Sequence, residues 1–443
     1  MPITPGTTLR WLSKHGMARV GIRAAARKGD PQAAFLLDPE RRADPYPFYA
    51  TIRERAPIVA GGFILATARH DVATAVLRSV AFGVGFHSRE VPAPVAVLRR
   101  LGQFHRPIGP VDPPSMLVVD PPEHTRYRRL VSKVFTPRAI EALRPRIAEV
   151  CDELLGRIGA RAADGGRVDL VAEYASLVPV TVIAEILGVP VAMREQFLRW
   201  GAAAAPTLDI GLTLRKYAAT EVAIRRSNDW MRGHLRRLRA EPGHDLLSRL
   251  VHVEDDRARL TEDELIATAG LLLAAGFETT VNLVGTGAAL LIAHPDQREP
   301  LGDDPGRWRN AVEEILRYDP PVQNTGRICR TATEVGGRHI RPNSVVSVMI
   351  GGANRDPSVF ADPDRFDVTR ANAREHLAFS GGVHYCLGAA LARLEGEIAL
   401  QALFSRYPGL ALAGEPHRRP TRILRGYDAL PVRLAAAAAP GTR

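Results

Sequence analysis

The sequence contains few cysteines. Only three occur among 443 residues, at Cys151, Cys329 and Cys386. Three cysteines spread over so long a chain do not make a disulfide framework, and this scarcity is typical of proteins that fold in a reducing compartment. No secretory signal pattern opens the sequence. We therefore expect a cytoplasmic protein.

Lysine is also scarce. The chain has four lysines, at Lys14, Lys28, Lys133 and Lys216, which leaves 55 of the 59 basic residues as arginine. The formal net charge of +11 would suit a nucleic-acid-binding protein, but no motif of that class accompanies it. A hydrophobic content of 46% is typical of a packed enzyme. We expect no nucleic-acid partner.

Long apolar stretches are rare, and the clearest one spans residues 265–294, where Glu278 is the only charged residue. Its length and composition would suit a transmembrane helix. A glutamate near the middle of a bilayer costs about 3 kcal/mol, however. Thr261 and Glu264 form a capping box before the stretch, and Pro295 ends it. We predict one long helix, buried on nearly all sides in a large core, and no transmembrane segment.

Cys386 lies between glycines just before a helical stretch. Gly381 and Gly382 precede it, Gly388 follows it, and the composition favours a helix from Ala389 onward. The first backbone N–H groups of a helix are unpaired donors at its positive end, and such a place stabilises a thiolate. The first two glycines allow a turn through positive φ, and the third makes room for a flat, bulky group. The pattern indicates a metal ligand, and an ordinary buried cysteine is the alternative.

Residues 275–280 are unusual for the interior of an apolar helix. Gly276 costs about 1 kcal/mol relative to alanine. Thr279 can hydrogen-bond to the carbonyl group of Ala275, which would open the helix locally. Glu278 lies beside this threonine. An acid next to an alcohol at such an opening predicts a route for protons into an apolar pocket.

Short strands account for a smaller part of the sequence. Two apolar runs flank Gly61 and Gly62, which predicts a hairpin with a tight turn. A second hairpin is expected around Gly336 and Gly337. Most of residues 120–320 has helical composition.

The cysteine loop and the interrupted helix resemble the cytochrome P-450 family. The family's haem-binding loop is matched by Phe379, Gly382, His384, Cys386 and Gly388. The resemblance covers residues 35–434 and implies a mainly α fold with a small β part (α+β). One large domain would hold haem between the long central helix and the helix of the cysteine loop. Residues 1–34 would then be a basic N-terminal extension and residues 435–443 a flexible tail.

The resemblance implies roles for individual residues. Cys386 is the expected metal ligand. The residues expected to contact the haem propionates are His124, Arg128, Arg327 and His384. Those expected beside the haem are Phe379, Gly388 and Ala275. The expected catalytic pair is Glu278 and Thr279, and the expected buried structural network is Glu314, Arg317 and Arg365.

The function implied is that of a haem-thiolate monooxygenase, which inserts one atom of dioxygen into a hydrophobic small molecule. The cofactor would be haem b, with electrons from NAD(P)H arriving through a separate ferredoxin and ferredoxin reductase. Two alternatives are a haem-thiolate protein that binds ligand without turnover and a peroxide-driven peroxygenase. The intact pair Glu278 and Thr279 favours the monooxygenase, because neither alternative needs a proton delivered to dioxygen.

Two surfaces complete these expectations. The basic cluster predicted to dock an acidic ferredoxin consists of Arg126, Arg129, Lys133 and Arg138. The substrate pocket is expected to be lined by residues 322–324 and by apolar residues of the loop 82–116, namely Phe82, Phe86, Phe104, Met116 and Leu117. The sequence departs from the family pattern at Ser380, where many members have glycine, and at Phe277, where many have a smaller or polar residue.

Overall fold

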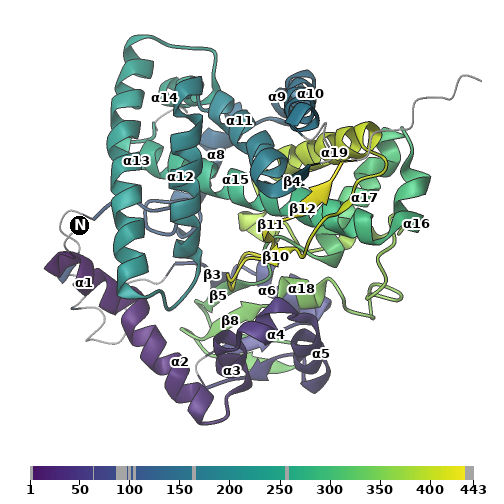
Figure 1. Cartoon of the computed structure of the whole chain (residues 1–443). Helices are drawn as coiled ribbons and strands as arrows, with labels where there is room; N and C mark the ends of the chain where they lie inside the picture. The colour runs from purple at the N-terminus through teal and green to yellow at the C-terminus, as the bar shows by residue number, and fades with distance from the viewer. Residues whose placement is uncertain are drawn as a thin grey trace, which may run out of the picture.

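The computed structural model describes residues 3–62, 64–85, 97, 101–102, 106–161, 166–254 and 259–434. Helices make up most of this part of the chain, and its strands are short (Figure 1). The predicted mainly α fold with a small β part is confirmed. The predicted tail 435–443 lies outside the described residues, as do Phe86 and Phe104.

The first helices of the chain lie at opposite ends of the molecule, with α3–α5 at the bottom of Figure 1 and α9 and α10 at the top. They are α1 (Pro5–Trp11), α2 (Met17–Arg27), α3 (Pro31–Leu37), α4 (Pro39–Ala43), α5 (Tyr46–Arg55), α6 (His70–Arg78), α8 (Glu123–Val134), α9 (Pro137–Glu141), α10 (Arg144–Arg161), α11 (Leu177–Ile186) and α12 (Arg194–Ala204). Shorter helical turns are η1 (Leu12–Gly16), η3 (Val171–Ala175), η4 (Val191–Met193) and η5 (Ala205–Leu208).

The remaining helices include the longest ones. They are α13 (Leu214–Ala240), α14 (Leu246–His252), α15 (Glu262–Ala293), α16 (Pro295–Arg298), α17 (Pro305–Tyr318), α18 (Ile350–Ala353) and α19 (Ala389–Arg406), with the turns η6 (Glu299–Leu301), η7 (Ala373–Glu375) and η8 (Gly382–His384).

The strands form small sheets. They are β1 (Val59–Ala60), β2 (Leu65–Thr67), β3 (Phe82–Gly83), β4 (Arg167–Asp169), β5 (Thr325–Cys329), β6 (Thr333–Val335), β7 (Arg338–Ile340), β8 (Val345–Val348), β9 (Ala411–Leu412), β10 (His417–Arg418), β11 (Tyr427–Ala429) and β12 (Pro431–Arg433). The largest sheet has the order β1-β2-β8-β5-β3, in which only the pair β2 and β8 is parallel. Both predicted hairpins are confirmed, as β1 with β2 and β6 with β7.

Helix α15 runs through the centre of the molecule. In Figure 1 α12 and α13 lie on its left and α17 and α19 on its right. The predicted capping box is present, since Thr261 accepts from the Glu264 N–H group and Glu264 accepts from the Thr261 N–H group. Among the described residues α15 alone is long and apolar enough to cross a membrane, but 67% of its most apolar window is buried inside the protein.

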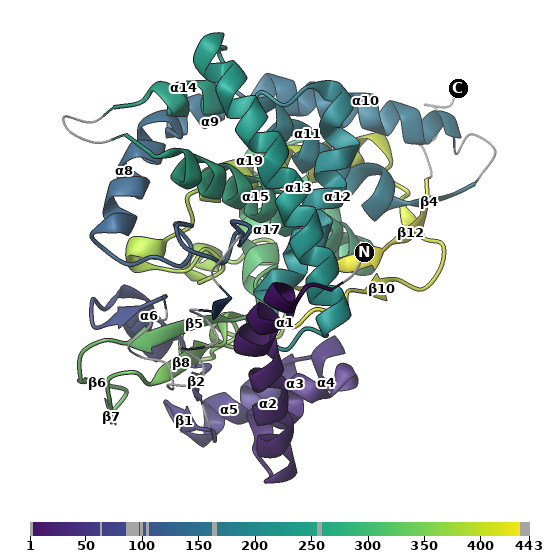
Figure 2. The same cartoon turned by 90° about the vertical axis from the view of Figure 1, so that its left-hand side faces the viewer.

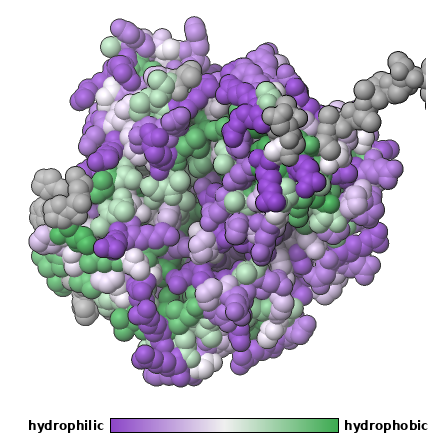
Figure 3. Space-filling model, viewed as in Figure 1, coloured by the Kyte–Doolittle hydropathy of each residue, from purple (hydrophilic) through white to green (hydrophobic). Residues whose placement is uncertain are grey.

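The N-terminal extension packs against the rest of the fold. Helix α1 lies beside α13 (Figure 2), where the buried side chains of Arg10 and Glu221 form an ion pair. Exposed apolar side chains of α2 include Met17 and Val20. The side of the molecule on which these helices lie carries broad apolar areas (Figure 3).

The predicted network of Glu314, Arg317 and Arg365 is only partly as expected. Arg317 donates from Nε and Nη2 to the two oxygens of Glu314, at 2.7 and 2.8 Å, and neither side chain is exposed. The third cation is Arg370, whose Nε lies 3.3 Å from Glu314 Oε2. The prediction for Arg365 was wrong, because its side chain is exposed and only its carbonyl oxygen accepts from Arg317.

The substitution Glu314→Ala is expected to lower the free energy of unfolding by about 3 to 5 kcal/mol, because it leaves the buried Arg317 guanidinium without its carboxylate. Urea unfolding measures this loss. The control Arg365→Ala should stay within about 0.5 kcal/mol of the wild type, as for an exposed side chain. Equal losses in both variants would show that Arg365 belongs to the network after all.

Candidate active site

The cysteine loop makes a tight turn before α19. The Cys386 N–H group donates to the Phe379 carbonyl at 2.9 Å, and Gly388 is the N-cap of α19, as predicted. Gly382 has a φ of +64°, but Gly381 is extended at −158°. Ser380 takes the second left-handed position, with φ +62°. That position favours glycine, which gives a physical reason for the family's usual residue there.

The Cys386 side chain is solvent-accessible, although protein atoms surround it on most sides. Desolvation by these surroundings raises the pKa of the Cys386 thiol. The Gly388 N–H group and the nearby charges of Arg128 and Arg393 act in the opposite direction. The positive helix end is therefore present, but in the protein alone desolvation outweighs it.

A buried carboxylate, that of Glu313, contacts residues on either side of the cysteine loop in the sequence. Glu313 contacts His376 at 3.0 Å and Arg393 at 2.8 Å. Burial tends to raise the pKa of Glu313, but these two partners lower it to about 2. The Arg393 guanidinium lies 4.4 Å above the Phe379 ring and donates to the Tyr385 hydroxyl. Sequence reasoning missed Glu313 and Arg393, since no local pattern pairs residues 80 positions apart.

The four predicted propionate residues converge on this loop from three segments. Arg128 of α8 donates to the Tyr385 carbonyl at 2.7 Å, and Arg327 of β5 donates to Ser380 Oγ at 3.0 Å. The His124 and His384 rings lie 4.2 Å apart. Asp120, at the start of the α8 region, lies 3.9 Å from His384 Nε2.

Two of these four groups are arginine cations, one buried and one half-buried. Arg327 is 4% exposed, and burial lowers its pKa to about 10. Burial also lowers the pKa of Arg128. Their hydrogen bonds go to neutral oxygen atoms, namely hydroxyl and carbonyl groups. His384 Nε2 is buried with no hydrogen-bond partner among the described residues.

The hydrogen bond predicted within α15 is present, but the helix runs unbroken from Glu262 to Ala293, so the opening is the exposed position at Ala275 and not a break in the helix. Thr279 Oγ1 donates to the Ala275 carbonyl at 2.6 Å. Ala275 is exposed in the middle of this otherwise buried helix, and Thr279 is half-buried. Phe277 points away from the opening, because its ring packs against Gly201 of α12.

Glu278 is 2% exposed and forms an ion pair with Arg419, which sequence reasoning missed. Arg419 also donates to the Tyr427 carbonyl at 3.0 Å and lies 3.4 Å from Asp428. The second carboxylate oxygen of Glu278 has no hydrogen-bond partner within the described ranges. The carboxylate is thus fixed on one side by the C-terminal strands and free to accept a proton or a hydrogen bond on the other.

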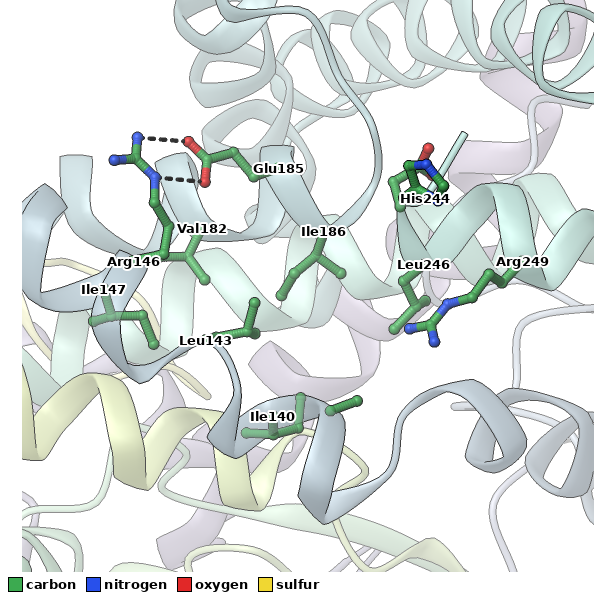
Figure 4. A pocket seen from close by; sticks show the side chains of 12 residues that line it. Ile140, Leu143, Arg146, Ile147, Val182, Glu185, Ile186, His244, Leu246 and Arg249 are labelled. Carbon is green, nitrogen blue, oxygen red and sulfur yellow. Dashed lines mark hydrogen bonds and ion pairs between the residues drawn. The ribbon is translucent and has the colours of Figure 1, made fainter. Parts of the chain in front are cut away.

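One pocket lies away from these groups. It has a volume of about 210 Å³, and α9, α10, α11 and α14 line it (Figure 4). Arg146 and Glu185 form an ion pair at its edge. None of the predicted site residues lines it, so we do not assign the active site to it.

Comparison with known proteins agrees with the resemblance. A sequence model described as Cytochrome P-450 matches residues 308–420. Cytochrome P-450 140 of Mycobacterium tuberculosis is 45% identical over 432 residues, covering 97% of this chain and 98% of the relative. The 6-deoxyerythronolide B hydroxylase of Saccharopolyspora erythraea is 42% identical over 400 residues, covering 88% and 96%. A ligand-free crystal structure of a Mycobacterium smegmatis P-450 superposes with a TM-score of 0.79 at 37% identity, covering 90% and 98%.

These likenesses define a class of protein, the haem-binding monooxygenases. The chain belongs to the cytochrome P-450 family. Haem is the cofactor of this family, and the enzyme class is accordingly that of a cytochrome P-450 monooxygenase.

The described residues fit a haem group. Haem carries two carboxylates, and among the described residues the half-buried Arg128 and the buried Arg327 donate to neutral acceptors. A Cβ atom at Gly388 would meet no protein atom within 4 Å, so the chain leaves room beside the loop. An accessible sulfur at a helix start is a suitable donor for iron.

A second buried acid lies between α15 and α19. Glu395 is 2% exposed, and burial raises its pKa to about 8. A hydrogen bond with Thr280 acts to lower this pKa but does not outweigh burial. The unfolded chain ionises this carboxyl near pH 4.5. Because the pKa of Glu395 is higher in the folded than in the unfolded chain, the protonated carboxyl stabilises the fold. This contribution to the free energy of unfolding is complete below pH 4.5 and is lost as the pH rises to about 8.

The variant Glu395→Gln should therefore lose stability less steeply than the wild type between pH 5 and about 8, with a difference of at most about 5 kcal/mol. Urea unfolding at a series of pH values measures both slopes. Parallel curves for the two proteins would mean that Glu395 is ionised in the folded state.

Proposed function

We propose that this monooxygenase oxidises a bulky, hydrophobic small molecule with electrons supplied by a ferredoxin and its NAD(P)H-dependent reductase. The observation that carries the proposal is the convergence of four basic side chains, two buried and two half-buried, on the Cys386 loop, together with the opening at Ala275 and Thr279 in α15. A haem-thiolate oxygenase needs both features, one to hold the cofactor and one to admit dioxygen and protons.

The proposed roles of the haem-holding residues follow from their contacts. Cys386 would supply the thiolate that binds the haem iron, and its loop is held by the Phe379 carbonyl and by Arg393. Arg128, Arg327, His124 and His384 hold the two propionates. The cost of burying the two arginine cations is offset by the propionate charges. Phe379, Gly388 and Ala275 form the walls next to the ring.

When bound, haem with a thiolate ligand supplies the activation of dioxygen. Thr279 is proposed to hold a proton at Oγ1 and to deliver it into the pocket. The Ala275 carbonyl orients this hydroxyl at 2.6 Å. Glu278 is proposed to replenish the proton from its unpartnered oxygen, while Arg419 fixes the other side of the carboxylate.

The substrate class rests on relatives and on the residues around the opening. The 6-deoxyerythronolide B hydroxylase and the vitamin D(3) 25-hydroxylase of Pseudonocardia autotrophica, both 42% identical, act on bulky apolar molecules by name. Leu117 is exposed in the predicted lining, while Met116 and Phe82 are buried. We propose a substrate of comparable size and apolarity.

The proposed ferredoxin site is the exposed basic surface of α8 and α9. Arg129, Lys133 and Arg138 are exposed there. Arg126 is removed from the predicted cluster, because it forms an ion pair with Glu264 and donates to the Arg259 carbonyl. An acidic partner would be steered to such a surface in a salt-dependent manner.

The experiment that tests the haem-thiolate assignment is the spectrum of the reduced carbonyl complex. Freshly purified, haem-loaded protein should absorb at about 450 nm, as expected for thiolate ligation. Cys386→His protein should absorb at about 420 nm instead, whereas Cys329→Ala should keep the wild-type maximum. A wild-type maximum at about 420 nm would reject Cys386 as the ligand. Titration of the same protein with a panel of macrolides, steroids, terpenes and lipids would then identify the substrate class.

Thr279→Ala is expected to consume NAD(P)H but to form about 10² to 10⁴-fold less product, because general acid assistance is lost. The electrons should appear as hydrogen peroxide, measured beside product with the best substrate of the panel. Thr286→Ala is a matched control, since Thr286 is a buried threonine of the same helix and its hydroxyl has no partner among the described residues. Tight coupling in the Thr279→Ala enzyme would show that this threonine only packs.

A further inference from the structure

The N-terminal segment, residues 7–19, forms hydrogen bonds with the loop that joins α12 to α13. This loop, residues 205–213, receives two donors from the segment: Trp11 Nε1 donates to the Leu212 carbonyl at 2.8 Å, and Arg19 donates to the Gly211 carbonyl at 2.7 Å. In the opposite direction, the Gly211 and Leu212 N–H groups donate to His15 Nδ1 at 3.3 and 3.4 Å.

His15 is suited to accept these hydrogen bonds. The residue is 6% exposed, and burial, helped by the neighbouring Lys14, lowers its pKa to about 4 against the opposing effect of Asp112. The ring is therefore neutral at physiological pH. A neutral imidazole accepts at one nitrogen only, and here that nitrogen serves both backbone donors.

The same segment is anchored at two further places. The buried Glu221 of α13 pairs with Arg10 and accepts from Thr7 Oγ1 at 2.8 Å and from the Tyr217 hydroxyl at 3.2 Å. Arg10 also donates to the Gly102 carbonyl at 3.2 Å. Lys14 forms an ion pair with Asp112. The segment thus joins the loop 205–213 to α13 and to residues of the loop before α8.

On its other side, the loop 205–213 contacts residues 422–423, which in turn contact the predicted pocket lining. The Asp209 carboxylate accepts from the N–H groups of Arg422 and Ile423, at 3.0 and 3.1 Å. The Ile423 carbonyl in turn accepts from the Gln323 N–H group, within the predicted pocket lining. Four residues before the loop, Gly201 of α12 packs on Phe277, two residues from Thr279. The end of α12 and the loop together therefore contact α15 near Thr279 and, through residues 422–423, the segment 322–324.

We infer that His15 and Arg19 are positioning residues that set substrate access and size selection, by holding the loop 205–213 over the proposed pocket, while Arg10 anchors their segment to α13. The inference rests on the proposed function, because it needs a haem pocket under the loop. Release of the loop would widen the passage for a bulky ligand. A small ligand would be affected little, since it does not need the loop to move.

The test compares two nitrogen ligands of haem iron that differ in size, imidazole and clotrimazole, by stopped-flow absorbance. His15→Leu removes the acceptor of two backbone donors, and Arg19→Ala removes one donor at a half-buried position that leaves the core intact. Loss of one such hydrogen bond changes an opening equilibrium about fivefold. We therefore expect clotrimazole to associate about fivefold faster in each variant, with imidazole within about twofold of the wild type.

Arg23→Ala is the control, since Arg23 is an exposed arginine of α2 that lies outside the contacts described above. It should bind both ligands at wild-type rates. Wild-type clotrimazole rates in both test variants, with a normal carbonyl spectrum, would overturn the inference. Equal acceleration of both ligands would also overturn it, because size selection would be unaffected.

Hydrogen exchange separates this inference from the proposed function. The Gly211 and Leu212 amides should exchange faster in His15→Leu than in the wild type or in Arg23→Ala, whether or not haem is bound. If the wild type bound neither azole, the proposed function would fail, and the exchange rates alone would decide on the loop contact. Unchanged exchange at these two amides would then reject it.

Discussion

The interaction on which the structure depends most is the pairing of buried arginine guanidinium groups with hydrogen-bond acceptors. A buried cation costs several kcal/mol unless an anion or a full set of acceptors compensates it. Arg317 has its carboxylate in Glu314, and Arg10 has one in Glu221. Arg327 is similarly buried, but its side chain donates to the neutral oxygens of Thr325, Gly326 and Ser380, and Asp120 acts on it only through its charge. This difference from Arg317 and Arg10 is the physical basis on which we propose Arg327 as a binding group for an external anion.

The same reasoning explains why the C-terminal strands matter for the site. Helix α15 is continuous at Ala275, but the Thr279 hydroxyl donates to the Ala275 carbonyl there, which places polar groups inside an apolar core. Glu278 at this opening would be costly as an isolated carboxylate. Arg419 compensates it on one side only. The segment around residues 417–428 thus fixes the orientation of the acid, although it is about 140 residues away along the chain.

Local chemistry decided which features could be predicted from the sequence. The capping box at Thr261, the bond from Thr279 to Ala275 and the hairpin turns depend on residues within four positions of one another. The partner of a buried charge depends on the tertiary fold instead. With 55 arginines in the chain, spacing alone could not separate Arg370 from Arg365, or find Arg419 as the partner of Glu278. The family resemblance predicted the haem-contacting residues together, but it did not predict these partners that lie far apart in the sequence.

The N-terminal extension shows the limit of composition as a guide to exposure. Its composition predicted only a basic extension, whereas Arg10 is 6% exposed and is paired with an acid 211 positions away. A relative that aligns over 97% of this chain must share much of this extension. Because the extension contacts Gly211, Leu212 and Asp112 directly, its sequence is under the same packing constraints as the core. The loop 205–213 therefore packs between the N-terminal extension and residues 422–423, and its position depends on these neighbours as well as on its own sequence.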